Sequence, residues 1–309
     1  MPPDPVVSVV IPAYNAEKTI GNAIDSVLEQ TMSDLEVIVV DDASTDGTVH
    51  VVEAAGDPRV RLLRSPWNCG PAVARNLGVK RATGRWVTFL DADDEYVPSR
   101  LEGLLEAAAG DCDCFVADWI VASVPDPGGR LAPLRLPTLP AQPLAENFEF
   151  TDYLKLAMDV MPIVPRATLT RHHIEFSPWA HSGEWAPLIA RLCAMGIRGR
   201  LLHRVGYLYR GTGTHHSSTL RSIEEQLQAT EFLAADADVP EAAKEILRQG
   251  IPGTRRRLVV AALREGKLAK FACYARRNPT DLVWLPASVL CFLWRQVRYR
   301  VASLSSRPA

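Results

Sequence analysis

The segment Leu35–Thr48 reads LEVIVVDDASTDGT, and its character changes twice within this short span. Its first six residues are mostly apolar and rich in β-branched side chains, which is typical of a buried strand. Two adjacent acids follow, and then the sequence STDG, which suits a turn or the start of a helix. From Thr48 the sequence TVHVVEAA continues with helical spacing. A strand, a polar loop and a helix are therefore predicted in this order.

The same order extends to both sides of this segment. Between the first strand and Leu35, the apolar residues Ile20, Ile24, Val27 and Leu28 fall at helical spacing. Alternation of strands and helices is typical of a parallel sheet covered by helices. We therefore predict an α/β fold with a mostly parallel, twisted sheet. The further predicted strands are VVSVVIP (6–12), VRLL (60–63) and WVTFL (86–90).

Polar residues follow the predicted strands at their carboxyl ends, where open α/β sheets bind ligands. The first strand runs into Tyr14 and Asn15, the second into Asp41 and Asp42, and the strand WVTFL into the sequence DADDE at 91–95. Carboxylates packed this closely repel one another, so we expect a cation beside them. Carboxylates at a strand end suit Mg²⁺ or Mn²⁺ that is also bound by substrate phosphates.

Composition and motifs exclude several other classes of protein. With 309 residues, 47% hydrophobic and 23% charged, the chain is of the globular type. GxGxxG is absent after the first strand and GxxxxGK[ST] is absent throughout, which disfavours dehydrogenases and P-loop enzymes. A phosphatase of the D-x-D-x-[TV] type is disfavoured because Glu95 stands where Thr or Val is required. The six cysteines lack CxxC spacing and the N-terminus lacks a secretory pattern, so we expect cytoplasmic residence.

Three ordered stretches resemble a known family: VSVVIPAYNAEKTIGNAIDSVLEQT, VIVVDDASTDGT and WNCGPAVARNLGVKRATGRWVTFLDADD. They resemble the N-terminal half of the family 2 inverting glycosyltransferases with the GT-A fold, of the kind that builds bacterial surface polysaccharides. The resemblance covers residues 6–105 closely and continues more weakly to about residue 220. It implies a metal-dependent hexosyltransferase that moves a sugar, with inversion, from a nucleotide-sugar to a hydroxyl of a glycan or lipid-linked acceptor.

The resemblance also implies which residues bind the nucleotide-sugar. Pro12, Tyr14 and Asn15 would line the base and ribose, although Tyr14 and Asn15 can alternatively close a turn. Asp42, or its neighbour Asp41, would hydrogen-bond the pyrimidine edge. A carboxylate can accept from the N3–H of uracil, so UDP is expected rather than a purine nucleotide. The other positions implied near the nucleotide and sugar are Asn68, Gly70, Arg75, Asn76 and Asp91.

Metal binding is assigned by the resemblance to the D-x-D motif. Asp93 would bind Mn²⁺ or Mg²⁺, with Asp94 in support, and Asp91 would bind ribose or sugar hydroxyls close to the ion. Related enzymes place a histidine near the metal or diphosphate, and the loop YRGTGTHHS offers His215 or His216 for this role. We take His215 as the third candidate ligand.

The catalytic base is expected at Glu184, which opens a helical pattern and resembles the acidic motif of the family. That motif has two successive acids, whereas here Trp185 follows Glu184. An acid at a helix start also stabilises the helix dipole in many proteins. If Glu184 is not the base, His181 and Asp159 are the next candidates. The alternative function is a catalytically weak, glycosyltransferase-like protein that only binds nucleotide-sugars.

The remainder of the chain suggests three parts. A proline-rich stretch at 124–144 marks a linker, so we predict a nucleotide-sugar-binding half at 1–122, a linker and acceptor half at 123–220, and a helical basic extension at 221–309. From Arg248 onward, thirteen Arg or Lys face two acids, which gives +11 and, with a net charge of −2, leaves −13 for the preceding residues.

The apolar stretch LVWLPASVLCFLW at 282–294, followed by arginines, is too short to span a bilayer. It suits an interfacial helix on an anionic membrane surface, at the inner face of the cell membrane. The alternative is a helix packed on the catalytic domain. Nucleic-acid binding is not expected, because the aromatic residues lie inside the apolar stretch and not among the basic residues.

Overall fold

The structure of the chain is a computed structural model that describes residues 5–111, 113–122, 144–156, 160–178, 183–210 and 219–277. The chain divides into two compact units, residues 1–248 and 249–309. The predicted boundaries near 122 and 220 remain a prediction. The Pro-rich linker and the apolar stretch at 282–294 lie outside the described residues.

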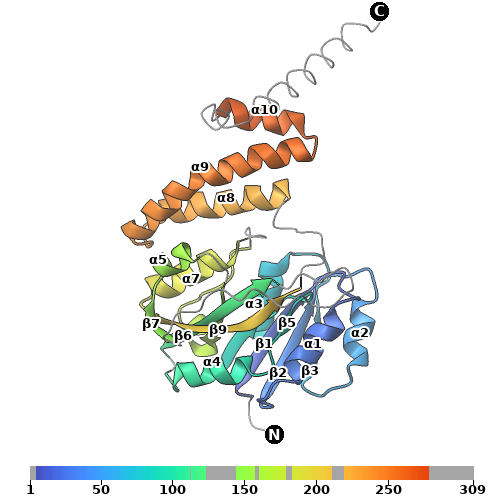
Figure 1. The fold of residues 1–309 in the computed structure, drawn as a ribbon. Coiled ribbons are helices and arrows are strands. Elements are labelled where there is room, and N and C mark those ends of the chain that lie inside the picture. The colour runs from blue at the N-terminus through green and yellow to red at the C-terminus, as the bar shows by residue number, and fades with distance from the viewer. Residues whose placement is uncertain are drawn as a thin grey trace, which may run out of the picture. The chain divides into compact units, whose positions relative to one another are not determined.

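A single sheet forms the centre of the first unit (Figure 1). The strand order is β3-β2-β1-β4-β8-β6-β9-β5, with β7 paired to β9. Strands β1 to β4 pair in parallel, and the rest of the sheet is mixed. The predicted α/β fold is therefore confirmed, and its parallel part is the N-terminal half. The strands are β1 (Val7–Ala13), β2 (Leu35–Asp41), β3 (Val60–Arg64), β4 (Trp86–Phe89), β5 (Glu95–Tyr96), β6 (Cys114–Ala122), β7 (Leu144–Phe148), β8 (Val160–Pro165) and β9 (Arg198–Tyr209).

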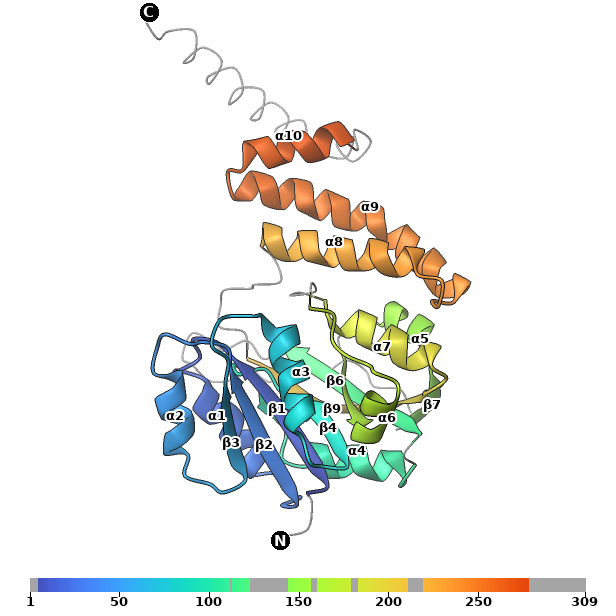
Figure 2. The ribbon, with the colours of Figure 1, turned by 180° about the vertical axis from the view of Figure 1, so that it is seen from behind.

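Helices cover both faces of the parallel strands, which explains why these strands are apolar along their length. Helices α1 (Ile20–Leu28) and α2 (Thr48–Ala54) lie on one face, and α3 (Pro71–Arg81) lies on the other (Figures 1 and 2). The chain runs outward from β1 to β3 and then returns through α3 to β4 on the other side of β1. The direction of winding thus reverses between β1 and β4, the point where open α/β sheets bind ligands.

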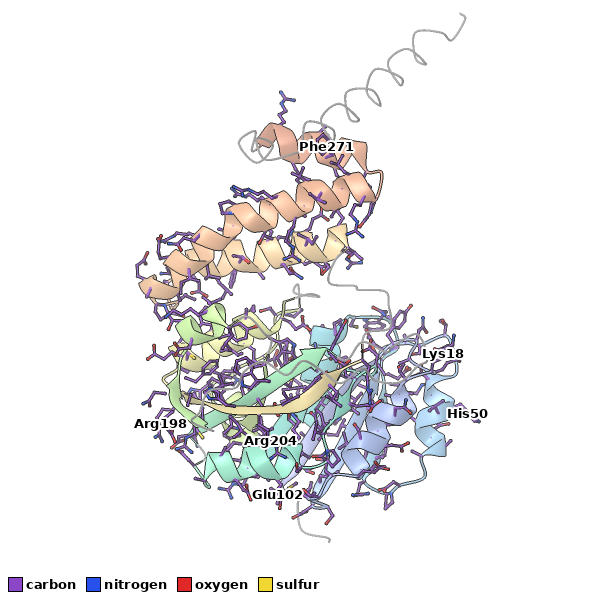
Figure 3. All side chains as sticks on the ribbon, viewed as in Figure 1. Lys18, His50, Glu102, Arg198, Arg204 and Phe271 are labelled. Carbon is purple, nitrogen blue, oxygen red and sulfur yellow. The ribbon has the colours of Figure 1, made fainter. Side chains whose placement is uncertain are left out.

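Five more helices lie wholly within the described part of the first unit that follows β4. Aromatic contacts join it to β4, because Phe89 packs edge to face on Phe176 at 5.0 Å and on Trp185 at 5.5 Å between ring centroids. Exposed polar side chains such as His50, Glu102 and Arg198 project outward (Figure 3). The helices are α4 (Arg100–Ala108), α5 (Phe150–Lys155), α6 (Arg166–Arg171), α7 (Trp185–Ala194) and α8 (Leu220–Ala235).

The described part of the C-terminal extension, residues 221–277, is helical, as the sequence predicts. Helix α9 (Glu241–Arg264) runs through the boundary between the two units and contains Pro252, and α10 (Leu268–Arg277) follows it. Within the described part of the chain, no helix has both the length and the apolar character needed to cross a bilayer.

Candidate active site

A pocket of about 940 Å³ opens at the carboxyl ends of β1, β2 and β4. Ten of the residues expected from the sequence line it together. Because parallel strands end at one edge of the sheet, loops that lie far apart in sequence meet there. The ten residues are Pro12, Tyr14, Asn15, Asp42, Asn68, Gly70, Arg75, Asp91, Asp93 and Glu184.

The loop after β1 combines a structural and an exposed residue. Asn15 has a positive φ of 50°, its backbone N–H donates to Ser44 Oγ at 2.9 Å, and its side-chain oxygen accepts from the Thr45 N–H at 2.8 Å. Asn15 therefore joins the loops that follow β1 and β2. Tyr14, which is 52% exposed, presents its ring to the pocket.

The two acids at the end of β2 differ in their surroundings. Both Asp42 oxygens accept from backbone N–H groups, of Cys69 at 2.8 Å and Gly70 at 2.7 Å, so Asp42 fixes the loop that enters α3. Asp41 does not line the pocket. Its Oδ1 accepts from the Ser44 N–H at 3.3 Å, and its Oδ2 lies 4.0 Å from Arg64 Nε. Of the two candidates for the pyrimidine edge, the pocket contains Asp42.

Arg75 links the D-x-D motif to the acid at the start of α7. Its guanidinium donates to Asp91 Oδ1 at 2.5 Å and to Glu184 Oε1 at 2.6 Å, and only 2% of the side chain is exposed. The guanidinium carbon also lies 5.0 Å from the centre of the Trp185 ring. Burial alone would lower the pKa of Arg75, but Asp91 and Glu184 raise it, so this arginine stays charged.

Glu184 lies immediately before α7 and is 7% exposed. Burial raises its pKa above the ordinary value, and the charge of Arg75 partly opposes this rise. Trp185, which follows Glu184 where the resemblance predicts a second acid, packs on Arg75 and Phe176 and is not part of the pocket lining. The pocket thus contains one acid from this motif.

The D-x-D segment brings three carboxyl groups, those of Asp91, Asp93 and Asp94, close together. Asp94 is buried and accepts from the Tyr207 hydroxyl at 2.7 Å and the Arg210 N–H at 2.8 Å. Burial and the charges of Asp91 and Asp93 together raise the pKa of Asp94 to about 8. Neighbouring carboxylates that disfavour one another's ionised form are suited to a cation.

Among the described residues, no group of three His, Cys, Asp or Glu side chains converges to hold a metal ion. An ion at Asp91 and Asp93 would therefore need ligands from a substrate, as is usual for Mg²⁺ bound with a diphosphate. The donor set of two carboxylates fits this mode of binding. His215 and His216 lie outside the described residues, as do His181 and Asp159.

Helix α8 contributes to the pocket, and no sequence pattern predicts this contribution. Its first two turns supply Arg221, Ser222 and Glu225, and Thr219 caps the helix by accepting from the Ser222 N–H at 3.1 Å. Arg221 pairs with Glu225 at 2.9 Å. The four-residue spacing of this pair is visible in the sequence, but it indicates only neighbours on a helix. The other polar lining residues that were not predicted are Glu17, Lys18, Thr19, Asp46 and Tyr209.

Comparison with known proteins identifies the family. The sequence model of Glycosyl transferase family 2 matches residues 8–171, more than half of the chain. The chain belongs to this family. The succinoglycan biosynthesis protein ExoO of Rhizobium meliloti (strain 1021) is 38% identical over 212 residues, which cover 66% of this chain and 60% of ExoO. ExoU of the same strain is 31% identical over 260 residues, covering 75% of this chain and 72% of ExoU.

Shorter matches and solved structures agree with this assignment. The Escherichia coli protein named UDP-Glc:alpha-D-GlcNAc-diphosphoundecaprenol beta-1,3-glucosyltransferase WfgD is 44% identical over 99 residues, 32% of this chain and 39% of WfgD. The present chain thus spans less than two thirds of the length of ExoO and of WfgD. S. aureus TarS 1-349, solved in complex with UDP-GlcNAc, matches with a TM-score of 0.61 and 22% identity, covering 82% of this chain and 79% of TarS 1-349. That likeness confirms the GT-A fold.

Proposed function

We propose that this protein is a metal-dependent, inverting hexosyltransferase that transfers a sugar from a UDP-sugar to a hydroxyl of a glycan or a lipid-linked acceptor. The observation that carries the proposal is the pocket at the ends of β1, β2 and β4, where the residues expected to bind a nucleotide-sugar lie together. Its volume of about 940 Å³ falls in the usual range of small-molecule sites.

Several observations support a uridine nucleotide as donor. TarS has been solved with UDP and with UDP-GlcNAc, and the name of WfgD gives UDP-Glc as its donor. In this chain the half-exposed ring of Tyr14 offers a surface on which a base can stack. Asp42 uses one lone pair of each oxygen for Cys69 and Gly70, so it can still accept from the N3–H of uracil. Pro12, Asn15 and Asn68 complete this side of the pocket.

Asp93 and Asp91 are the proposed ligands of a divalent ion, Mn²⁺ or Mg²⁺. When bound, such an ion neutralises charge on the diphosphate and stabilises it as a leaving group. Asp91 is held by Arg75, which keeps its carboxylate in one position and offers a positive charge nearby. His215 remains a proposed third ligand on the sequence pattern alone.

In the proposed reaction the acceptor oxygen attacks the anomeric carbon from the side opposite the diphosphate. A carbon–oxygen bond forms to the acceptor, the bond to the diphosphate oxygen breaks, UDP leaves, and the proton of the acceptor hydroxyl passes to a base. Glu184 is the proposed base. Arg75 donates to its Oε1, Oε2 is the proposed proton acceptor, and burial raises the pKa of the carboxyl group.

A second candidate function is nucleotide-sugar binding with little catalysis. Two observations favour it: Trp185 stands where the family has its second acid, and Glu184 is tied into an ion pair with Arg75. A base in such a pair is a weaker proton acceptor, because the positive charge favours the ionised form.

We further propose that the protein acts in the cytoplasm at the inner face of the cell membrane. The excess of positive charge after residue 248 and the apolar stretch at 282–294 support this location. A lipid-linked acceptor would be found at such a surface. No nucleic-acid partner is proposed.

Release of UDP from candidate UDP-sugars, with Mn²⁺ and with EDTA, tests the proposed activity. We expect release that depends on the metal and falls at least about a hundredfold in Asp93→Ala, which is about 2.7 kcal/mol of barrier. Glu95→Gln is the matched control, because Glu95 belongs to the same acidic segment, pairs with Arg210 and does not line the pocket. Full activity in EDTA, or an active Asp93→Ala variant, would overturn the proposal. Nucleotide binding without UDP release would favour the second candidate.

A further inference from the structure

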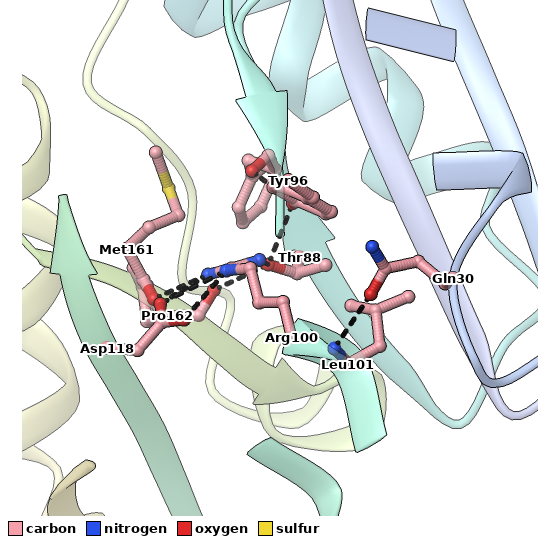
Figure 4. Close-up of polar contacts among 9 residues, drawn as sticks. Gln30, Thr88, Tyr96, Arg100, Leu101, Asp118, Met161 and Pro162 are labelled. Carbon is pink, nitrogen blue, oxygen red and sulfur yellow. Dashed lines mark hydrogen bonds and ion pairs between the residues drawn. The ribbon is translucent and has the colours of Figure 1, made fainter. Parts of the chain in front are cut away.

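A buried ion pair joins Arg100 to Asp118 (Figure 4). Arg100 of α4 donates to the carboxylate of Asp118 on β6, with 2.7 Å between Nη2 and Oδ1, and both side chains are at most 2% exposed. Arg100 also donates to the carbonyl oxygen of Met161 at 3.0 Å and to Thr88 Oγ1 at 3.3 Å. These partners hold the guanidinium in one position, because losing any of them would leave a buried polar group unsatisfied.

Two tyrosines pack against this guanidinium. The guanidinium carbon of Arg100 lies 4.2 Å from the centre of the Tyr96 ring and 5.9 Å from the centre of the Tyr207 ring. The two rings pack edge to face, with 5.8 Å between their centroids. Gly206, which precedes Tyr207, allows this approach, since a Cβ there would lie 1.8 Å from Asp118 Oδ2. Tyr96 and Tyr207 therefore share one rigid surface.

The hydroxyl groups of the two tyrosines serve different parts of the chain. The Tyr96 hydroxyl donates to the carbonyl oxygen of Phe89, the last residue of β4, at 2.5 Å. That of Tyr207 donates to Asp94 Oδ2 at 2.7 Å and accepts from the Asp91 N–H at 3.0 Å. One hydroxyl thus fixes both ends of the turn that carries the D-x-D motif.

The turn needs such a restraint because its side chains repel one another. Its own backbone contributes a bond from the Asp94 N–H to the Asp91 carbonyl oxygen at 3.1 Å. Asp91 and Asp93 face the pocket, and Asp94 points into the protein toward Tyr207 and the Arg210 N–H. If the Tyr207 hydroxyl were lost, a buried carboxyl group would lose a donor and the Asp91 N–H would lose an acceptor. The spacing of the two pocket carboxylates would then no longer be fixed.

We propose that Tyr207 is a positioning residue that holds the carboxylates of Asp91 and Asp93 in the arrangement needed to bind a divalent ion together with a nucleoside diphosphate. The inference rests on the proposed function. It adds a residue that is buried, lies on a distant strand, and acts on the ion through the backbone and side chains of the D-x-D turn. Mutating a residue that orients metal ligands in this way typically lowers metal affinity or activity by about 10- to 100-fold.

The experiment compares Tyr207→Phe with Tyr96→Phe in the full chain. Each variant removes one buried hydroxyl and keeps its ring on Arg100, so the two are matched in burial and packing. The affinity for UDP is measured by calorimetry in Mn²⁺ and in EDTA, the affinity for Mn²⁺ is measured at saturating UDP, and thermal unfolding of each protein is recorded.

For Tyr207→Phe we expect the affinity for UDP in Mn²⁺ and the affinity for Mn²⁺ to fall by about 10- to 100-fold. For Tyr96→Phe we expect changes of less than about twofold, with similar losses of thermal stability in both variants.

Other outcomes would contradict the inference in distinct ways. Equal loss of affinity in the two variants would assign the effect to general destabilisation of the site. Equal loss in Mn²⁺ and EDTA would show that Tyr207 shapes the nucleotide pocket and not the ion site. Unchanged affinities in Tyr207→Phe would overturn the inference directly. If the wild-type protein failed to bind UDP in Mn²⁺, the proposed function would fail first, and the inference with it.

Discussion

Arg75 connects two carboxylates that the sequence places far apart, since Glu184 lies 109 positions further along the chain. The three side chains form a largely buried group in which one positive charge serves two negative ones. Removing one member of such a group leaves an uncompensated buried charge, which typically costs about 3–5 kcal/mol. A test of Glu184 must therefore preserve its shape and its hydrogen bond to Arg75.

Glu184→Gln meets this requirement, because the amide oxygen can still accept from Arg75. If Glu184 is the base, we expect UDP affinity to stay near that of the wild-type protein and transfer to fall by about 10² to 10⁴. Calorimetry with UDP and the rate of UDP release in the presence of an acceptor measure the two effects separately.

Glu225→Gln is the control for this prediction. Glu225 also lines the pocket, and its partner Arg221 is 75% exposed, so their ion pair contributes little to stability. Loss of transfer in Glu225→Gln with a normal rate in Glu184→Gln would move the role of base to α8. Loss of UDP affinity together with rate in Glu184→Gln would make Glu184 a structural residue.

Among the strands, β2 contains an acid where its burial predicts an apolar residue. Glu36 is the second residue of β2, which lies between β1 and β3, and its Oε1 accepts from Ser8 Oγ on β1 and from the Thr83 N–H, both at 2.7 Å. Its Oε2 accepts from Arg61 of β3 at 2.8 Å. One carboxylate therefore fastens β2 to both neighbouring strands and to the turn before β4.

The pKa of Glu36 gives a stability prediction with a definite sign. Burial would raise this pKa, but the hydrogen bonds from Ser8, Thr83 and Arg61 outweigh burial and lower it. The stabilisation is therefore complete above the pKa of the unfolded chain, about 4.3, and is lost as the pH falls through the lower pKa of the folded state.

We expect Glu36→Gln to reduce the free energy of unfolding by about 1–3 kcal/mol at pH 7 and by progressively less below about pH 4. Denaturant unfolding at several pH values measures this difference. Glu53→Gln on the exposed side of α2 is the control and should change stability by less than about 0.5 kcal/mol. A loss in Glu36→Gln that stays constant from pH 7 to pH 3 would show that the carboxylate charge is not the cause.

At the scale of the whole molecule, charge is distributed unevenly along the chain. The residues from Arg248 onward carry an excess of positive charge, and the preceding residues carry an excess of negative charge. A basic segment with an apolar stretch is suited to an anionic lipid surface, where each Lys or Arg contributes about 1 kcal/mol.

Deleting Thr280–Ala309 should release the protein from anionic liposomes and leave UDP affinity nearly unchanged, because the pocket residues lie between 12 and 225. Co-sedimentation at low and high salt measures binding. Replacing Arg295, Arg298 and Arg300 with Gln separates charge from the apolar contribution and should weaken binding by about 3 kcal/mol at low salt. A full-length protein that ignores such liposomes at low salt would show that the membrane assignment is wrong.

The sequence by itself determined the parallel half of the fold and much of the site. Strands such as Val7–Ala13 and Leu35–Asp41 are buried on both faces and therefore appear as nearly continuous apolar runs. Their carboxyl ends must meet at one edge, so Tyr14, Asp42 and Asp93 could be placed together from their order alone. Glu184 was found by resemblance to a family motif, because no local pattern distinguishes it from a helix-capping acid.

Only the tertiary structure decided which charges face one another. The pairing of Arg75 with Glu184, the support of the D-x-D turn by Tyr207, and the entry of Glu225 into the pocket all join segments far apart in the chain. It also decided that Asp41, the last residue of β2, lies outside the pocket while Asp42, the first residue of the following loop, lines it. Local patterns report periodicity and burial, whereas the partner of a buried charge depends on how the whole chain packs.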